Sequence, residues 1–299
     1  MKSLKLIWQK IAPQYIQSFV NIYTDTSENK EKRRKVLSYY GSKRKSELTV
    51  EERDVIRFFQ YHRYSPFPYR WTLKYDKLIP EVLFDDTVSF YYILFEGKRL
   101  YFPKNFTRNQ VIWTMRSILK EQDEKSAHLY LTDTFQVEND SIMVDGGVAE
   151  GSLSLSLIEK LKKLYLIECE PNWLEALRLT FSPWKDKVEI IGKYLSDTAD
   201  EQNVSIDSML EVKTDEKYFI KLDVEGYEKQ ALKGMNHFFS KVKNLKMCVC
   251  TYHFDNDAVD IHHILKDKRL NCEFSDGYLL FDNENELPTF RKALIRAWK

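Results

Sequence analysis

The chain has 299 residues, which is enough for two domains of ordinary size or one elaborated domain. Hydrophobic residues make up 43% of it, so a core can form. Its 46 Lys and Arg residues nearly balance 45 Asp and Glu residues, leaving a formal net charge of +1. That balance argues against a protein that holds nucleic acid by bulk positive charge. The four cysteines show no CxxC spacing, which argues against a zinc ribbon and favours buried free thiols in a cytoplasmic protein.

Residues 1–124 are predicted to form an N-terminal extension of helices and a β-hairpin. The first twenty residues are interrupted by polar residues and a proline, so we expect an amphipathic packing helix there and no membrane insertion. Apolar runs on both sides of Glu96 and Gly97 predict the hairpin. We expect this extension to shape acceptor binding or to mediate self-association into a homo-oligomer.

Two helix starts are marked within the extension by the capping-box pattern, in which Ser or Thr is followed three residues later by Glu or Gln. Thr49 with Glu52 is the first such pair, and Thr107 with Gln110 is the second. In this motif each side chain accepts a hydrogen bond from the backbone N–H of the other residue. The second helix is predicted to run to about Lys120.

The pattern of apolar and polar residues changes at about residue 141, where short apolar runs begin to alternate with helical patterns. Such alternation predicts an α/β domain over residues 125–299, with a mostly parallel sheet covered by helices on both faces. The run "GSLSLSLIEKLKK" reads as the first helix of this domain. Near the end, "CEFSDGYLLFD" predicts two antiparallel strands around Asp276 and Gly277.

The stretch "MVDGGVAEG" has the form of a strand, an acid and a glycine turn that opens a helix, and it predicts a nucleotide site. The turn comprises Asp145, Gly146, Gly147, Val148, Ala149, Glu150 and Gly151. An NAD-type G-x-G-x-x-G turn would need glycine at position 145, and a carboxylate there has the wrong sign for a pyrophosphate. S-adenosylmethionine, which carries a sulfonium and an ammonium, suits an acid at that position.

Acids at other strand ends complete the predicted cofactor site, because ligands of such folds lie outside the carboxyl ends of the strands. Glu170 follows the next strand, 25 residues after Asp145, and its carboxylate can accept hydrogen bonds from both ribose hydroxyls. Ser196 and Asp197 are predicted to border the adenine. We expect Asp145→Ala and Glu170→Ala to weaken cofactor binding without unfolding the chain.

Candidate catalytic residues follow two further strands. Lys221 and Asp223 share one face of a strand by its period of two, where they lie beside the cofactor or form an internal ion pair. Asp223 could instead contact the methionine part of the cofactor. Glu225 and His253 are the candidates for a general base or for acceptor binding. Asp223, Glu225 and His253 could share a divalent ion, but no ligand spacing demands one, and no metal site is predicted.

The C-terminal half resembles the FkbM family of S-adenosylmethionine-dependent methyltransferases. The turn "MVDGGVAEG" is similar to the family's "IDVGANIG", "CEP" to its "FEP", and "IKLDVEGYEKQALKG" to its "lKiDvEGaE..vl.G". The resemblance covers about residues 125–299. It implies a Rossmann-like, seven-stranded sheet of the class I methyltransferase type with a reversed terminal hairpin, and methylation of a hydroxyl on a sugar, polysaccharide precursor or secondary metabolite.

The sequence also departs from the family. Gly146 stands where the family often has Val, Glu150 replaces a hydrophobic residue, and the fifth strand ends in Thr251-Tyr252-His253 where the family often has Glu-x-His. Loss of that acid keeps open a non-catalytic module that binds cofactor or glycan. A nucleic-acid methyltransferase is a further alternative, against which the neutral charge and the lack of an [DN]-P-P-[YFW] motif weigh. We expect a small-molecule or glycan acceptor and no nucleic-acid partner.

Overall fold

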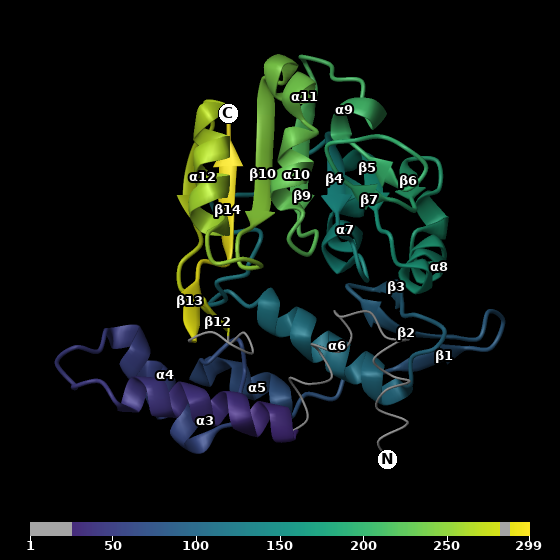
Figure 1. The fold of residues 1–299 in the computed structure, drawn as a ribbon. Helices are drawn as coiled ribbons and strands as arrows, with labels where there is room; N and C mark the ends of the chain where they lie inside the picture. The colour runs from purple at the N-terminus through teal and green to yellow at the C-terminus, as the bar shows by residue number, and fades with distance from the viewer. Residues whose placement is uncertain (1–25, 282–287) are drawn as a thin grey trace.

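A seven-stranded sheet with the order β11-β14-β10-β9-β4-β5-β6 dominates the computed structural model, which describes residues 26–281 and 288–299 (Figure 1). Its strands are β4 (Ser141–Gly146), β5 (Leu161–Ile167), β6 (Val188–Ile191), β9 (Lys217–Leu222), β10 (Asn244–Cys250), β11 (Asn271–Phe274) and β14 (Leu294–Trp298). Neighbouring strands are parallel except around β14, which is antiparallel to β10 and β11. The predicted α/β fold with a mostly parallel sheet is therefore confirmed. The helix predicted in the first twenty residues lies outside the described residues.

Helices cover both faces of the sheet because successive strand residues point to opposite sides. Met143 and Phe219 join a core with one group of helices, while their neighbours Val144 and Ile220 join a core with another. The first group comprises α7 (Ser152–Leu157) and α8 (Pro171–Thr180); the second comprises α9 (Ile206–Met209), α10 (Glu228–Lys233), α11 (Asn236–Lys241) and α12 (Asp257–Asp267). The parallel pairing of β4 with β5 and β9 places the carboxyl ends of these three strands together at one edge of the sheet.

The helix predicted from "GSLSLSLIEKLKK" is shorter than expected. Helix α7 ends at Leu157, a 3₁₀ turn covers Ile158–Lys160, and β5 has already begun at Leu161. Leu161 and Leu164 are almost fully buried in the sheet core. Burial in the sheet therefore overrides the helical preference of "EKLKK", so the last part of that prediction is wrong.

The predicted pairing of the C-terminal hairpin is also wrong. Strand β11 pairs with β14, and β12 (Leu279–Phe281) pairs instead with β13 (Thr289–Arg291) in a separate two-stranded sheet. Tyr278 and Leu280 are buried in a cluster with apolar residues of α3 and α4. The Asp-Gly signal predicts only a local turn. The position of the second strand is set instead by its packing against α3 and α4.

The described part of the N-terminal extension contains helices and a small antiparallel sheet. Its elements are α3 (Ser27–Gly41), α4 (Val50–Tyr61), α5 (Leu73–Asp76), α6 (Arg108–Glu121), β1 (Leu83–Asp85), β2 (Phe90–Phe95) and β3 (Lys98–Tyr101). Both predicted capping boxes are present, at Thr49 before α4 and at Thr107 before α6. The predicted hairpin is confirmed, with positive φ angles at Glu96 and Gly97 in its turn.

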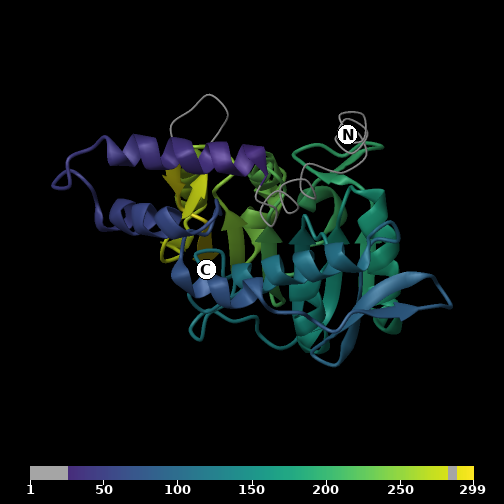
Figure 2. The same ribbon diagram turned by 90° about the horizontal axis from the view of Figure 1, so that it is seen from below.

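Helix α6 lies across the edge of the sheet where the parallel strands end, as both views show (Figures 1 and 2). Its residues Val111, Met115 and Ile118 belong to the same hydrophobic cluster as α7 and α8. The extension therefore shares a core with the α/β domain. The boundary between residues 124 and 125 stays a prediction.

Within residues 26–281 and 288–299, no helix is long and apolar enough to cross a membrane. The cytoplasmic location stays a prediction.

Candidate functional site

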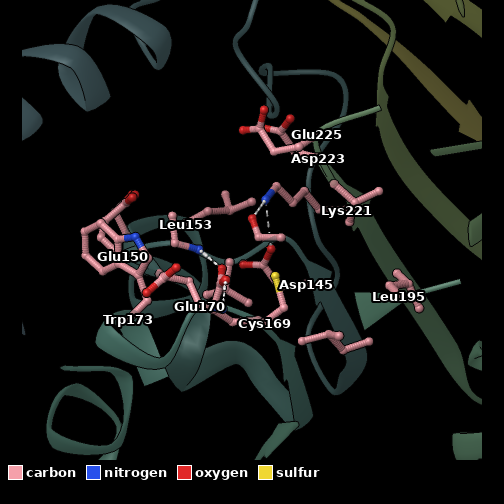
Figure 3. A pocket seen from close by; sticks show the side chains of 18 of the residues that line it. Asp145, Glu150, Leu153, Cys169, Glu170, Trp173, Leu195, Lys221, Asp223 and Glu225 are labelled. Carbon is pink, nitrogen blue, oxygen red and sulfur yellow. Dashed lines mark hydrogen bonds and ion pairs between the residues drawn. The ribbon is translucent and has the colours of Figure 1, made fainter. Parts of the chain in front are cut away.

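A cavity of about 380 Å³ lies at the carboxyl ends of β4, β5 and β9 and extends to the last turn of α6 (Figure 3). Ten of the predicted site residues line it: Asp145, Gly147, Val148, Ala149, Glu150, Gly151, Glu170, Lys221, Asp223 and Glu225. Four predicted residues do not line it: Gly146, Ser196, Asp197 and His253. Ser196 and Asp197 follow β7 (Tyr194–Leu195), which pairs with β8 (Asn203–Val204), and Asp197 is exposed.

The glycine turn brings the backbone of two strands unusually close. Gly147 has a φ of +72°, and a Cβ atom added to it would lie 1.8 Å from the carbonyl oxygen of Asp223. Gly151 also has a positive φ, +79°, at the start of α7. Only glycine combines this conformation with so close an approach, so the turn forms one wall of the cavity with no side chain at position 147.

Lys221 forms an ion pair with Asp145 inside the sheet. Its Nζ lies 3.2 Å from Asp145 Oδ1, and it also donates a hydrogen bond to the Gly147 carbonyl. The other carboxylate oxygen of Asp145 accepts a 2.6 Å hydrogen bond from Ser154. Burial alone would lower the pKa of Lys221, but the negative charges of Asp145 and Asp223 outweigh it and raise that pKa. The negative charge of Asp145 is thus already balanced by a protein cation.

Asp223 is the centre of a hydrogen-bonded cluster at the end of β9. Its two carboxylate oxygens accept hydrogen bonds from the hydroxyls of Tyr130 and Tyr252, at 2.9 and 3.0 Å. Burial would raise its pKa, but Lys221 and the neighbouring histidines hold the pKa of Asp223 well below its usual range. Asp223 therefore stays ionised at neutral pH and is a poor proton acceptor.

Glu225 has the opposite electrostatic setting. Its backbone has a φ of +53°, unusual for a residue with a side chain, in the tight loop that follows β9. Partial loss of solvation at the cavity and the negative charge of Asp223 raise the pKa of Glu225 to about 7. Its side chain is nevertheless 59% exposed. A carboxyl group that is part ionised near neutral pH is well suited to accept a proton.

His253 lies behind the cavity wall, where it is paired with buried acid. Its Nδ1 is 3.2 Å from Glu228 Oε1, and its Nε2 is 3.7 Å from Asp223 Oδ1. Burial works against the charged form, but the close pairing with Glu228 and the surrounding carboxylates raise the pKa of His253 to about 9. The ring is therefore protonated at neutral pH, which suits holding Glu228 and Asp223 in place better than accepting a proton.

This pairing predicts a pH dependence of stability. The pKa of His253 rises from 6.5 to about 9 on folding, so its contribution is complete below pH 6.5 and is lost as the pH approaches 9. We expect the free energy of unfolding to fall by roughly 3 kcal/mol more over this range than in His253→Gln. Urea unfolding at several pH values measures this, with His263→Gln on the exposed side of α12 as a control that keeps the wild-type slope. Equal slopes in wild type and His253→Gln would contradict it.

A second acid lies beside Glu170 at the end of β5 and was missed in the sequence. Glu168 is 8% exposed, lines the cavity, and accepts hydrogen bonds from the backbone N–H groups of Ala149 and Glu170. Glu170 itself caps α8, accepting a 2.8 Å hydrogen bond from the Asn172 amide side chain. Glu168 is the first residue after β5, and this position could have identified it. Glu170 was chosen instead, because Glu170 belongs to the Glu-Pro motif.

Other lining residues come from segments that the sequence did not connect with the site. They are Ile118, Glu121 and Gln122 near the end of α6, Tyr130 in the segment that follows, Trp173 of α8, Lys193 and Tyr194 near β7, and Tyr227 after β9. The free thiol of Cys169 also lines the cavity, whereas Cys248 and Cys250 are free and fully buried in β10, as predicted.

Among the described residues, two groups of potential metal ligands meet at Asp223. One adds His128 and Cys250, and the other adds Glu228 and His253, with ligand atoms within 4.8 Å of one another in each group. The sequence predicted no metal site, and this stays a prediction.

Comparison with known proteins bears on the same region of the chain. Residues 182–274 match the family model of the methyltransferase FkbM domain. The resemblance to the FkbM family is confirmed. The matched segment includes Lys221, Asp223, Glu225 and His253, but it covers less than half of the chain and excludes the glycine turn. The seven-stranded, mostly parallel sheet with its antiparallel strand β14 agrees with the fold that the resemblance implied. The chain matches none of the curated protein sequences.

Several solved structures are similar to this one. Methyltransferase FkbM from Methylobacillus flagellatus KT is 20% identical over 63% of this chain and 54% of its own, with a TM-score of 0.44. An rRNA methylase from Streptococcus thermophilus is 18% identical over 55% of this chain and 89% of its own, with a TM-score of 0.36. A putative methyltransferase from Streptococcus mutans in complex with SAH is 12% identical over 55% and 91%, with a TM-score of 0.37. The chain thus spans about half the length of the Methylobacillus FkbM protein, and likenesses with TM-scores below 0.5 do not bear on its activity.

The structure also shows what the departures from the FkbM pattern do. Thr251, which stands where the family often has an acid, is buried and donates a 2.7 Å hydrogen bond to the Lys292 carbonyl oxygen. Glu150, which replaces a hydrophobic residue, turns a second acid toward the cavity beside Trp173 (Figure 3). Compared with the FkbM pattern, this chain therefore lacks a carboxylate at Thr251 and has an additional one, Glu150, at the cavity wall.

Proposed function

We propose that this protein is an S-adenosylmethionine-dependent methyltransferase that transfers a methyl group to a hydroxyl of a sugar, polysaccharide precursor or secondary metabolite. The observation that carries the proposal is an acidic cavity at the strand ends of a chain that matches the methyltransferase FkbM domain. The choice of a hydroxyl acceptor rests on the family resemblance alone.

The charge of the cavity lining suits the proposed cofactor. Seven acidic side chains line it against two lysines, Lys193 and Lys221; the acids are Glu121, Asp145, Glu150, Glu168, Glu170, Asp223 and Glu225. Such a lining disfavours a pyrophosphate and favours a ligand that carries positive charge. The open wall at Gly147 admits close approach of a ligand to the backbone.

Each group in the site has a role in this proposal. Bound S-adenosylmethionine supplies a methyl group already activated by a positively charged sulfur. Glu168 and Glu170 would accept hydrogen bonds from the ribose hydroxyls, and the Gly147 turn would hold the methionine portion. Glu225 accepts the proton of the acceptor hydroxyl, because its pKa of about 7 suits a general base. Asp223 would hold the hydroxyls of Tyr130 and Tyr252 in place, and alignment of the acceptor with the methyl group would supply much of the rate enhancement.

Calorimetric titration with S-adenosylmethionine, S-adenosylhomocysteine and NAD tests the cofactor. We expect micromolar binding of the two sulfur compounds and none of NAD. Failure of both sulfur compounds to bind would overturn the proposal. Binding without release of S-adenosylhomocysteine from a panel of hydroxyl compounds would favour the non-catalytic binding module, and turnover on RNA or DNA alone would favour the nucleic-acid alternative.

Glu170→Ala is expected to weaken S-adenosylhomocysteine binding about 10- to 100-fold, because hydrogen bonds to a charged acceptor contribute more than neutral ones. Glu175→Ala removes an exposed carboxylate from the same helix and serves as the matched control. The loss of the α8 cap in Glu170→Ala costs about 1 kcal/mol of stability, which a urea titration measures separately. Equal affinity in the two variants would contradict the role of Glu170. The expectation for Asp145→Ala changes, because its removal would strand Lys221 inside the sheet.

A further inference from the structure

The last residue of α6, Glu121, is an acid in an unfavourable place. It ends a helix of 14 residues, where the helix dipole carries partial negative charge and disfavours a carboxylate. It lines the cavity together with Glu150, Asp223 and Glu225. Burial and the negative charge of Glu150 raise the pKa of Glu121 well above its usual value. In the protein without ligand, burial and these neighbouring charges therefore disfavour the ionised form of Glu121.

Glu150 shares this setting. Its side chain is 9% exposed, and its carboxylate accepts one hydrogen bond, 2.6 Å long, from Ser152. Burial raises the pKa of Glu150 as well. Figure 3 shows Glu150 beside Trp173 on one side of the pocket, with Lys221, Asp223 and Glu225 across it. Lys221, a protein cation whose charge acts on Glu150, is already paired with Asp145.

We propose that Glu121 and Glu150 together bind the ammonium group of the cofactor's methionine portion, so that the N-terminal extension supplies part of the cofactor site. The inference rests on the proposed function. Glu168 and Glu170, which the proposed function assigns to the ribose, lie at the β5 end of the cavity, so the methionine portion of a bound cofactor would extend from there toward β4, β9 and α6. A sulfonium donates no hydrogen bond, whereas an ammonium donates three, and a carboxylate pair matches the ammonium.

Two ligands and three variants test this directly. The ligands are S-adenosylhomocysteine and its deamino analogue, in which hydrogen replaces the amino group. In the wild type, loss of the amino group should weaken binding about 10- to 100-fold. In Glu121→Gln, S-adenosylhomocysteine should lose a large part of this advantage, because only Glu150 then remains to bind the ammonium, whereas the analogue should bind both proteins equally. Glu124→Gln, which removes an exposed carboxylate three residues further along, is the control and should match the wild type.

The outcomes separate this inference from the proposed function. If the wild type binds neither ligand, the proposed cofactor is wrong and the inference falls with it. If the wild type binds S-adenosylhomocysteine and both Glu121→Gln and Glu150→Gln leave that affinity unchanged, the inference alone is overturned, and a cationic acceptor becomes the candidate for these carboxylates. Equal weakening of both ligands in Glu121→Gln would also overturn it. The melting temperature adds a second readout, because removing the repulsion should leave it unchanged or higher, whereas a structural role for Glu121 would lower it.

Discussion

Lys221→Met should lower the free energy of unfolding by about 3–5 kcal/mol, the usual effect of leaving a buried charge without its partner. The side chains of Lys221 and Asp145 are 6% and 2% exposed, and their charged atoms are 3.2 Å apart. Methionine keeps the length of the lysine side chain, so the change removes charge with little change in volume. Urea unfolding gives the value.

The same strand supplies a matched control. Lys217 lies four residues earlier on β9, is 46% exposed, and pairs with Glu138 at 3.2 Å. Lys217→Met should cost less than about 1 kcal/mol, because solvent screens an exposed pair. The double variant Asp145→Asn with Lys221→Met should regain much of the loss, since no buried charge is then left alone. A cost for Lys221→Met no larger than that of Lys217→Met would show that the internal pair does not hold the sheet ends together.

The sequence allowed the fold to be predicted where its signals were local. The capping boxes at Thr49 and Thr107 and the hairpin turn at Glu96 and Gly97 need only neighbouring residues, and all three are confirmed. The alternation of strands and helices after residue 141 likewise predicted the parallel sheet. The path of the chain after Asp276 was wrong, because β12 is placed by apolar contacts with helices more than 200 residues earlier in the chain, such as Leu280 with the cluster around Val36.

The partner of Lys221 shows a similar limit. Within one strand, residues two apart share a face, which suggested Asp223. Asp223 lies beyond the end of β9, however, and the strand register sets Asp145 of β4 directly beside Lys221. Register between strands that are distant in sequence cannot be read from either strand alone.

The candidate site was predictable only on the side built from strand ends. Asp145, Glu170 and Glu225 followed from the rule that ligands lie outside the carboxyl ends of parallel strands. Glu121 belongs to a helix whose docking across those ends depends on tertiary packing. No pattern in the sequence distinguished Glu121 from other acidic residues at helix ends.

Gly147→Ala should abolish measurable S-adenosylhomocysteine binding and destabilise the fold by several kcal/mol. The added methyl group would lie 1.8 Å from the carbonyl oxygen of Asp223, which is backbone and cannot rotate away. The two strand ends would have to separate, which would displace the Asp223 carboxylate and the turn that borders the cavity. A φ of +72° adds about 1–3 kcal/mol of strain for any residue with a side chain.

Gly97→Ala separates the two causes. Gly97 has a φ of +78° in the β2–β3 turn, and an added Cβ there would meet no atom within 4 Å. This variant therefore reports the backbone strain alone, and it should keep wild-type affinity because Gly97 does not line the cavity. The excess loss of stability in Gly147→Ala over Gly97→Ala, measured by urea unfolding, is the cost of separating β4 from β9. If the two variants lost equal stability and both retained binding, the close approach at Gly147 would not be what shapes the site.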